Sequence, residues 1–235
     1  MRKGNHDPPP LCRISIGKWW GMKERTFQIF LVFATFIILT VFVARQVTRP
    51  FDLMVTQWIQ SITSRQWDIA LYFFTVLGSI EFSCFALLVV CWYFYRKYHW
   101  PGVFLYLFFF MVLSGVEFLW KYIVANTAPG PEFDRNPFHW ALVMVRTPYA
   151  FPSGHTFRSL FLLGIWYQRL HNKFLPPKAY VWLHTLIISI FAFGIGYSRI
   201  YLGDHWMSDV VGGGLLAVLG LLLVSHSAQF ELRSA

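Results

Sequence analysis

Long runs of apolar residues alternate along this chain with short segments that carry most of its charge. Three of the runs contain 19, 20 and 21 consecutive uncharged residues. A helix needs about 20 apolar residues to cross the hydrocarbon core of a bilayer. Three further runs approach that length. The sequence therefore predicts six membrane-spanning helices, at residues 26–44, 78–95, 101–124, 153–170, 179–198 and 210–230.

The segment 51–77 differs from these runs because charged residues interrupt its apolar positions. Asp52, Arg65 and Asp68 are spread through it. This mixture is typical of amphipathic helices that lie at the membrane surface. We therefore expect an all-α fold, in which residues 26–230 form one six-helix transmembrane domain with an interfacial helical segment. A basic segment, 1–25, precedes this domain, and a short tail, 231–235, follows it.

The composition agrees with a membrane protein. Of the 235 residues, 56% are hydrophobic, 20% are aromatic and only 13% are charged, whereas soluble domains carry about 25% charged residues. Disorder is excluded because disordered chains combine low hydrophobicity with high charge. The 25 Phe, 11 Trp and 11 Tyr residues also exceed what the core of one soluble domain of this size would bury.

The formal net charge of +9 comes from basic residues in the gaps between apolar runs. Six spans place both termini on one side of the membrane, together with twelve of the 20 Lys and Arg residues. Basic residues favour the cytoplasmic side, so residues 125–152 should form an outward loop. Because the basic residues explain the topology, we expect no nucleic-acid partner. We expect a bacterial inner membrane, with this loop facing the periplasm.

Polar residues that could perform chemistry gather at the outward ends of four predicted spans. Charges at membrane depth are costly and are usually functional. These residues are Glu117, Lys121, Ser153, Gly154, His155, Arg158, Arg199, Asp204, His205 and Asp209. Glu117 can pair with Lys121 one turn away, and Asp204 can cap the last span.

These residue types suit the binding and transfer of phosphate. Gly154 lets a ligand approach the first N–H groups of a helix, and Arg199 can donate to two phosphoryl oxygens. His205 and Asp209 lie on one helical face, where the carboxylate could orient the imidazole as a nucleophile. His155 could then protonate the leaving oxygen.

Two segments resemble signatures of the type 2 phosphatidic acid phosphatase superfamily. The third signature is matched by Ser198-Arg199, five residues, His205, three residues and Asp209. The second signature is matched by Pro152-Ser153-Gly154-His155. The first signature, a Lys, six residues and Arg-Pro, appears here as Lys121 followed by Ala128-Pro129. The resemblance covers about residues 51–226.

This resemblance implies a phosphatase that needs no metal or other cofactor and works through a phosphohistidine on His205. Asp209 would orient His205, and His155 would be the general acid. The implied phosphate-binding residues are Lys121, Ser153, Gly154 and Arg199.

Ala128 stands where the family has an arginine. We expect Arg158, one helical turn from His155, to replace that arginine. Arg146 and Arg135 in the outward loop are the next candidates.

The expected substrate is a phosphorylated lipid in the bilayer: a phospholipid, a polyprenyl diphosphate or a lipid A-type glycolipid. A phosphotransferase of the same family and a non-catalytic lipid-binding or transport protein are the alternatives. The consecutive glycines 212–214 should allow close packing of helices.

Overall fold

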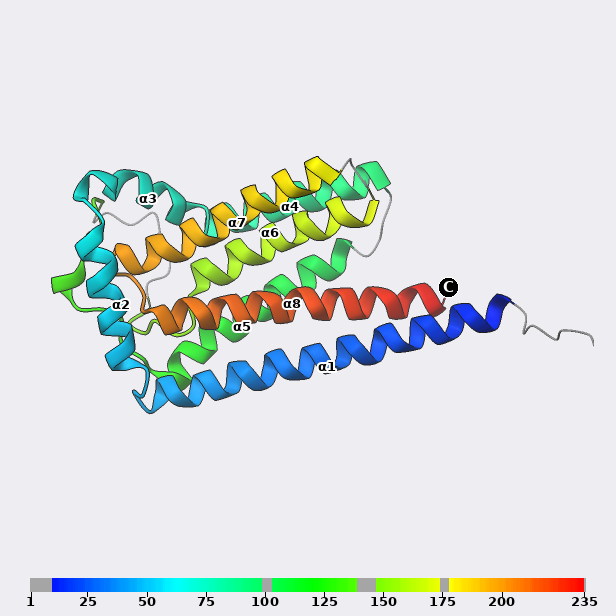
Figure 1. Ribbon diagram of the computed structural model, residues 1–235, viewed down its shortest axis with the longest axis horizontal. Helices are drawn as coiled ribbons and strands as arrows, with labels where there is room; N and C mark the ends of the chain where they lie inside the picture. Colours follow the sequence, from blue (N-terminus) through cyan, green and yellow to red (C-terminus); the bar gives the residue numbers. More distant parts are fainter. Residues whose placement is uncertain (1–9, 99–102, 139–146, 174–177, 235) are drawn as a thin grey trace, which may run out of the picture.

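The structure is a computed structural model that describes residues 10–98, 103–138, 147–173 and 178–234. In these residues the long helices are α1 (Pro10–Ala44), α4 (Ile80–Tyr98), α5 (Val103–Val124), α6 (Gly154–Lys173), α7 (Lys178–Tyr201) and α8 (Met207–Ser234). They run side by side along the length of the molecule (Figure 1). The start of α1 and the end of α8 lie at the same end of the bundle (Figure 1). The predicted all-helical architecture is confirmed.

Fewer helices meet the length and composition criterion for a membrane span than the six that the sequence predicts. Four helical segments are long and apolar enough to cross a bilayer: Lys23–Ala44, Val103–Val124, Trp182–Tyr201 and Met207–Ser227. A fifth span results if Arg65–Val76 and Ile80–Arg96, bent by 50°, cross together. Helix α6 does not meet this criterion because polar residues occupy both of its ends. Its middle is nevertheless buried, since Phe157, Phe161 and Ile165 are fully enclosed among α4, α5, α7 and α8.

Two short helices cover one end of the bundle. Helix α2 (Arg49–Ile62) lies across that end (Figure 1). It turns Asp52 and Ile59 inward and leaves Phe51 and Trp58 exposed, as an interfacial amphipathic helix should. A 3-10 turn, η1 (Arg65–Trp67), leads to α3 (Asp68–Val76). Helix α3 then leads into α4 through a bend of 50°. The whole segment 51–77 was predicted to lie at the membrane surface, but only α2 lies across the end of the bundle.

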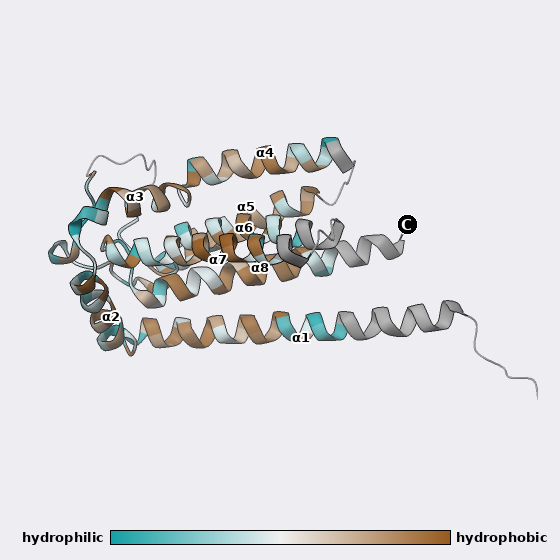
Figure 2. Ribbon diagram, turned by 45° about the horizontal axis from the view of Figure 1, so that its top comes forward, coloured by the Kyte–Doolittle hydropathy of each residue, from teal (hydrophilic) through white to brown (hydrophobic). Residues whose placement is uncertain are grey.

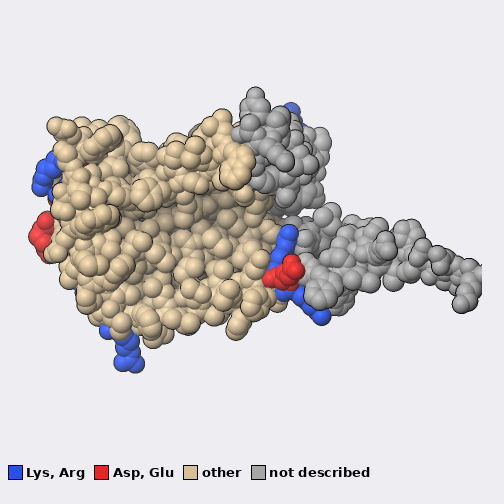
Figure 3. All heavy atoms as spheres, viewed as in Figure 1, with Lys and Arg blue, Asp and Glu red and all other residues tan. Residues whose placement is uncertain are grey.

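The outer surface of the long helices is apolar. Hydrophobic residues predominate along the middle of these helices (Figure 2). On the face shown in Figure 3, Lys, Arg, Asp and Glu lie toward the two ends, with a wide uncharged area between them. Exposed side chains such as Phe27, Phe85, Trp92 and Phe193 lie on these helices. This surface fits the hydrocarbon core of a bilayer, and the protein is an integral membrane protein.

Helices α6 and α8 pack closely where both begin. A Cβ atom added at Gly213 would lie 2.3 Å from the backbone oxygen of Ser153, and one at Gly212 would meet the ring of Phe151 at 2.6 Å. The predicted packing role of these two glycines is confirmed. At Gly214 the nearest atom, in Leu160, would be 3.5 Å away, which is an ordinary contact. Gly213 therefore brings the second turn of α8 against the first turn of α6.

Candidate active site

A cavity of about 1130 Å³ lies near the end of the bundle where α6 and α8 begin, between residues of α3 to α7 and connecting segments that include the turn before α8. Six of the predicted site residues line it: Lys121, Gly154, His155, Arg158, Arg199 and His205. Ala128 also lies on its wall. Segments separated by up to 84 positions, from Lys121 to His205, thus meet around one space.

The turn between α7 and α8 presents His205 to this cavity. Gly203 has φ +76°, and a Cβ there would lie 2.2 Å from the backbone oxygen of Phe133. Only glycine fits both the left-handed conformation and the close approach. The backbone N–H of His205 donates to the Arg199 carbonyl at 3.1 Å. These contacts hold the histidine at a fixed place just before α8.

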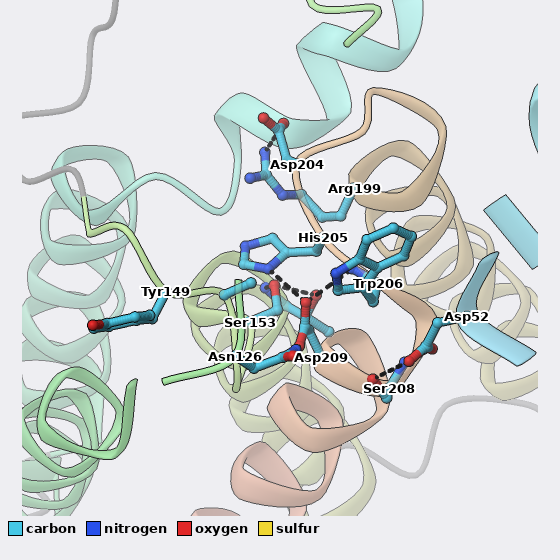
Figure 4. A network of polar contacts seen from close by, with 12 residues as sticks. Asp52, Asn126, Tyr149, Ser153, Arg199, Asp204, His205, Trp206, Ser208 and Asp209 are labelled. Carbon is cyan, nitrogen blue, oxygen red and sulfur yellow. Dashed lines mark hydrogen bonds and ion pairs between the residues drawn. The ribbon is translucent and has the colours of Figure 1, made fainter. Parts of the chain in front are cut away.

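Asp209 lies behind the His205 ring. The Nδ1 atom of His205 is 3.5 Å from Oδ2 of Asp209 (Figure 4), which is longer than a strong hydrogen bond and common in catalytic pairs without a ligand. The same Oδ2 accepts from the backbone N–H of Trp206 at 2.9 Å. Because Trp206 directly precedes α8, Asp209 also closes the first turn of that helix. The other ring nitrogen of His205 points away from Asp209 (Figure 4).

The surroundings of His205 favour its neutral form. Burial lowers the pKa of His205 well below its usual value near 6.5, and the positive charges of Arg199, Lys121 and Arg158 lower it further. The imidazole is therefore unprotonated at pH 7 and has a lone pair on one nitrogen, which a nucleophile requires.

Glu117 bridges two cations of the cavity wall. Its Oε1 lies 3.2 Å from Nζ of Lys121, and its Oε2 lies 3.5 Å from Nη1 of Arg158. The pairing with Lys121 was predicted from their spacing. The contact with Arg158 joins α5 to α6 and has no signal in the sequence. Lys121 also donates to the carbonyl of Ala150 at 3.3 Å, so it fixes the loop before α6.

Arg199 enters the cavity from the last turn of α7. Its Nη1 pairs with Oδ2 of Asp204 at 2.8 Å and donates to the hydroxyl of Thr75. Its Nε is buried and has no partner among the described residues. A buried donor of this kind is rare unless a ligand completes it. Asp204, which we predicted as a cap, therefore pairs with Arg199, while Asp52 of α2 accepts from the backbone N–H of Ser208 at 2.8 Å.

Ser153 and Gly154 have different positions. Ser153 is fully buried, and its Oγ accepts from the backbone N–H of Thr156 at 3.4 Å, as the N-cap of α6. Its side chain does not line the cavity. Gly154 does line it, and a Cβ there would lie 2.5 Å from Oε1 of Glu117. The backbone N–H of Ser153 donates to the carbonyl of Asp209 at 2.9 Å and so joins α6 to α8.

Three arginines were candidates to replace the arginine expected at position 128. Arg158 lines the cavity. Arg135 instead donates to the carbonyls of Gln60 and Thr63, at 2.8 and 3.0 Å, and lies over the ring of Tyr201. Arg146 lies outside the described residues. The geometry therefore favours Arg158.

Two further residues at the site were not predicted from the sequence. Asn126 donates to Asp209, and Thr75 contacts Arg199. Neither residue type is distinctive, and both contacts link distant parts of the chain. In the part of the chain that the structure describes, no group of three or more His, Cys, Asp or Glu residues is placed to hold a metal ion.

Two solved structures share this fold. The crystal structure of the first transmembrane PAP2 type phosphatidylglycerolphosphate phosphatase from Bacillus subtilis has a TM-score of 0.72 and 19% identity, and the match covers 86% of this chain and 96% of that one. The crystal structure of Aquifex aeolicus LpxE has a TM-score of 0.55 and 21% identity, covering 74% and 93% of the two chains. At these identities the likeness shows the fold alone.

Similarity in sequence is found to one curated relative and to one family. Bacitracin transport permease protein BcrC from Bacillus licheniformis is 37% identical over 79 residues, which is 34% of this chain and 34% of that protein. The match thus spans about a third of that relative's length. The sequence pattern of the PAP2 superfamily matches residues 102–233. Because this match includes more than half of the chain and all of the site residues described above from Lys121 to Asp209, the chain belongs to the PAP2 superfamily.

Proposed function

We propose that this protein is a membrane lipid phosphatase that works through a phosphohistidine on His205. One observation carries the proposal: two histidines and three cations line a single cavity at one end of an apolar bundle. Such a cavity can bind a phosphate group while the rest of a lipid stays in the membrane.

The proposed reaction has two steps. In the first, the ring nitrogen of His205 that points away from Asp209 attacks phosphorus, and the bond from phosphorus to the leaving oxygen breaks. His155 gives its proton to that oxygen, and Asp209 stabilises the positive charge on the ring of His205. In the second step, His155 takes a proton from water, and the water oxygen attacks phosphorus. The bond between phosphorus and the His205 nitrogen breaks, which releases phosphate and neutral His205.

The cations would stabilise the negative charge that develops on the phosphoryl oxygens. Arg199 has a buried Nε that the described chain leaves without a partner. Arg158 faces the same cavity as Ala128 and would supply the charge of the missing arginine. Lys121 and the first backbone N–H groups of α6, at Gly154, would complete the phosphate site. Ser153 would act by capping that helix.

The shape and lining of the cavity support a lipid substrate. Its wall continues from the cations to apolar side chains of α4 and α5, among them Phe82, Met111 and Phe118. A lipid chain would lie there, and the headgroup would face the loop side near Tyr149 and Asn136. A phospholipid, a polyprenyl diphosphate and a lipid A-type glycolipid share the required chemistry. We place the protein in a bacterial inner membrane with the site facing the periplasm.

A panel of purified lipids tests the proposal. Phosphate release is measured from phosphatidic acid, phosphatidylglycerol phosphate, undecaprenyl diphosphate and lipid A, with wild type and His205→Ala. We expect release by wild type from at least one lipid and loss of at least 1000-fold in the variant. Equal release by both proteins from every lipid would refute the catalytic role of His205.

Two controls separate the alternatives. Added alcohol acceptors distinguish hydrolysis from phosphotransfer, because a transferase would form a new phosphate ester in place of free phosphate. A chelator should leave the rate within about twofold, since no acidic cluster for a divalent ion is described. Inhibition by the chelator that added metal reverses would contradict the metal-independent reaction.

A further inference from the structure

A chain of side-chain amides ends on the carboxylate that faces His205. Nε2 of Gln46, in the connection between α1 and α2, donates to Oδ1 of Asn126 at 3.2 Å. Nδ2 of Asn126 donates to Oδ1 of Asp209 at 3.0 Å. Asn126 is only 4% exposed and Asp209 is fully buried. Figure 4 shows Asn126 beside Asp209, on the side away from the Arg199 and Asp204 pair.

The direction of this chain is fixed by a backbone carbonyl. An amide group can be turned over without changing its shape, so its orientation has to follow from its partners. Nε2 of Gln46 also lies 3.3 Å from the carbonyl oxygen of Val43, which can only accept. The NH₂ group of Gln46 therefore faces both Val43 and Asn126. Asn126 must then present its oxygen to Gln46 and its NH₂ group to Asp209.

The two carboxylate oxygens of Asp209 consequently have separate partners. Oδ1 receives the Asn126 amide, whereas Oδ2 receives the Trp206 backbone N–H and faces Nδ1 of His205. The contact with Asn126 prevents rotation of the carboxylate about its own axis. It thereby keeps Oδ2 directed at the histidine.

The backbone is unusual at Gln46 and at the residue before Asn126. Gln46 has φ +58°, and Ala125, next to Asn126, has φ +50°. Residues other than glycine seldom adopt this left-handed conformation, and strain of this kind tends to occur at functional sites. One amide residue and the neighbour of the other therefore have this conformation.

We propose that Asn126 is a positioning residue for the Asp209–His205 pair and that Gln46 orients Asn126. The proposal rests on the proposed function and extends it. Asn126 touches neither the substrate nor the attacking nitrogen; it acts by holding Asp209. Through Gln46, the connection between the first two helices contributes to the alignment of the nucleophile.

A double-mutant cycle tests whether Asn126 acts through Asp209. Asn126→Leu leaves one carboxylate oxygen without its donor, so we expect kcat to fall about 10- to 100-fold while KM stays within about twofold. In an Asp209→Asn background the same change should cause no further loss of kcat. Losses that multiply in the double variant would show an independent effect and would overturn the proposal.

The role of Gln46 is tested by replacing its side-chain NH₂ group with an oxygen. Gln46→Glu replaces the amide donor with an acceptor, so we expect Asn126 to turn over and kcat to fall at least fivefold. Unchanged kcat in this variant would remove Gln46 from the proposal. Gln60→Leu is a matched control, because Gln60 donates to the carbonyls of Phe133 and Tyr201, at 2.7 and 2.9 Å, at the same end of the bundle. It should lower the Tm and leave kcat within about twofold.

A spectroscopic measurement separates this inference from the proposed activity. Protein labelled with ¹⁵N-histidine in nanodiscs reports which ring nitrogen of His205 carries the proton, and His205→Ala assigns the signals. We expect the Nδ1-protonated form in wild type and a mixture of forms in Asn126→Leu. That change in a protein that hydrolyses no lipid would support the positioning role and refute the proposed function. The same tautomer in both proteins would overturn the positioning role even if the enzyme is active.

Discussion

The cations around the cavity are nearly balanced by carboxylates before any substrate binds. Glu117 pairs with Lys121 and Arg158, and Asp204 pairs with Arg199. Buried charges are costly unless they are paired. These pairs therefore let the protein keep three cations together at low cost, while each cation remains on the wall that a phosphate would meet.

Removal of Glu117 should destabilise the fold because it leaves two cations without their common partner. For Glu117→Gln we expect the free energy of unfolding to fall by about 3 kcal/mol. The measurement is thermal or denaturant unfolding in detergent. Glu132→Gln, at an exposed position, is the control and should change stability by less than about 0.5 kcal/mol. Equal stabilities of the two variants would contradict the bridging role.

The replacement of the missing arginine by Arg158 can be tested by exchange of positions. Arg158→Ala should lower kcat about 100-fold, since one donor to the developing charge is lost. Adding Ala128→Arg to that variant should recover at least tenfold, because position 128 lies on the same cavity wall. Steady-state kinetics on the best lipid of the panel measures both effects. An unchanged rate in Arg158→Ala would exclude it from the phosphate site.

The protonation of His205 can be followed directly by NMR. Its pKa is lowered mainly by burial and then by Arg199, Lys121 and Arg158. The ring should therefore stay neutral as the pH falls through 6.5 and become protonated only at lower pH. Arg199→Gln removes the largest of these charge effects, so the His205 signal of this variant should titrate at higher pH than in wild type. A wild-type midpoint above 6.5 would contradict this environment.

Residue contacts within one helix were predictable, whereas contacts between helices were not. The pair Glu117–Lys121 follows from a spacing of four within α5, which a helix converts into proximity. His205 and Asp209 are close as expected, but not on one helical face as predicted, because His205 lies in the turn before α8. The contacts of Arg158 with Glu117 and of Asn126 with Asp209 span 41 and 83 positions. No local sequence pattern predicts contacts between residues so far apart in the chain.

At the level of elements, main-chain contacts hold the start of α6 against the start of α8. Gly213 of α8 lies against the backbone oxygen of Ser153, and the Ser153 N–H donates to the Asp209 carbonyl. This junction places His155 on α6 at the same level as His205 before α8. The relative position of the two histidines therefore depends on helix packing.

Adjacent glycines provide a matched test of that packing. A methyl group at Gly213 would clash with backbone, whereas one at Gly214 would make an ordinary contact. We expect Gly213→Ala to lower the free energy of unfolding by about 2 kcal/mol, while Gly214→Ala stays within about 1 kcal/mol of wild type because alanine favours helices. Unfolding in detergent measures both. Equal effects would refute the close approach at Gly213.

The long helices were predictable because their apolar runs match the membrane thickness. The predicted spans 78–95, 153–170 and 179–198 correspond to Ile80–Tyr98, Gly154–Lys173 and Lys178–Tyr201. The bend between α3 and α4 was not predicted. Mixed polarity in residues 51–77 suits both a helix on the membrane surface and the start of a bent span, so the pattern alone could not distinguish them.

On the scale of the whole molecule, the site occupies one end of the bundle, whereas the start of α1 and the end of α8 lie toward the other end (Figure 1). Helices that enter and leave at one end require an even number of crossings. Helix α6 runs alongside the other long helices, although it is not among the segments that meet the length and composition criterion for a span.

The proposed orientation in the membrane predicts which residues a reagent can reach from outside the cell. In a variant without the native cysteines, Cys is placed at Glu132 near the site or at Glu24 near the start of the first apolar segment. A membrane-impermeant maleimide should label Glu132→Cys in intact cells and label Glu24→Cys only after the membrane is opened. The reverse pattern would invert the proposed orientation.

The hydrogen bond from Ser153 to Asp209 has a consequence for how such enzymes can diverge. Because it joins main-chain atoms, almost any amino acid at either position preserves it, and only proline at 153 would abolish the donor. Substitutions of the residues that line the cavity can thus change its lipid preference, while the distance between the His155 and His205 rings stays constant. Engineering of a new substrate preference should therefore begin with cavity-lining residues of α4 and α5 and leave the Ser153–Asp209 main-chain hydrogen bond unchanged.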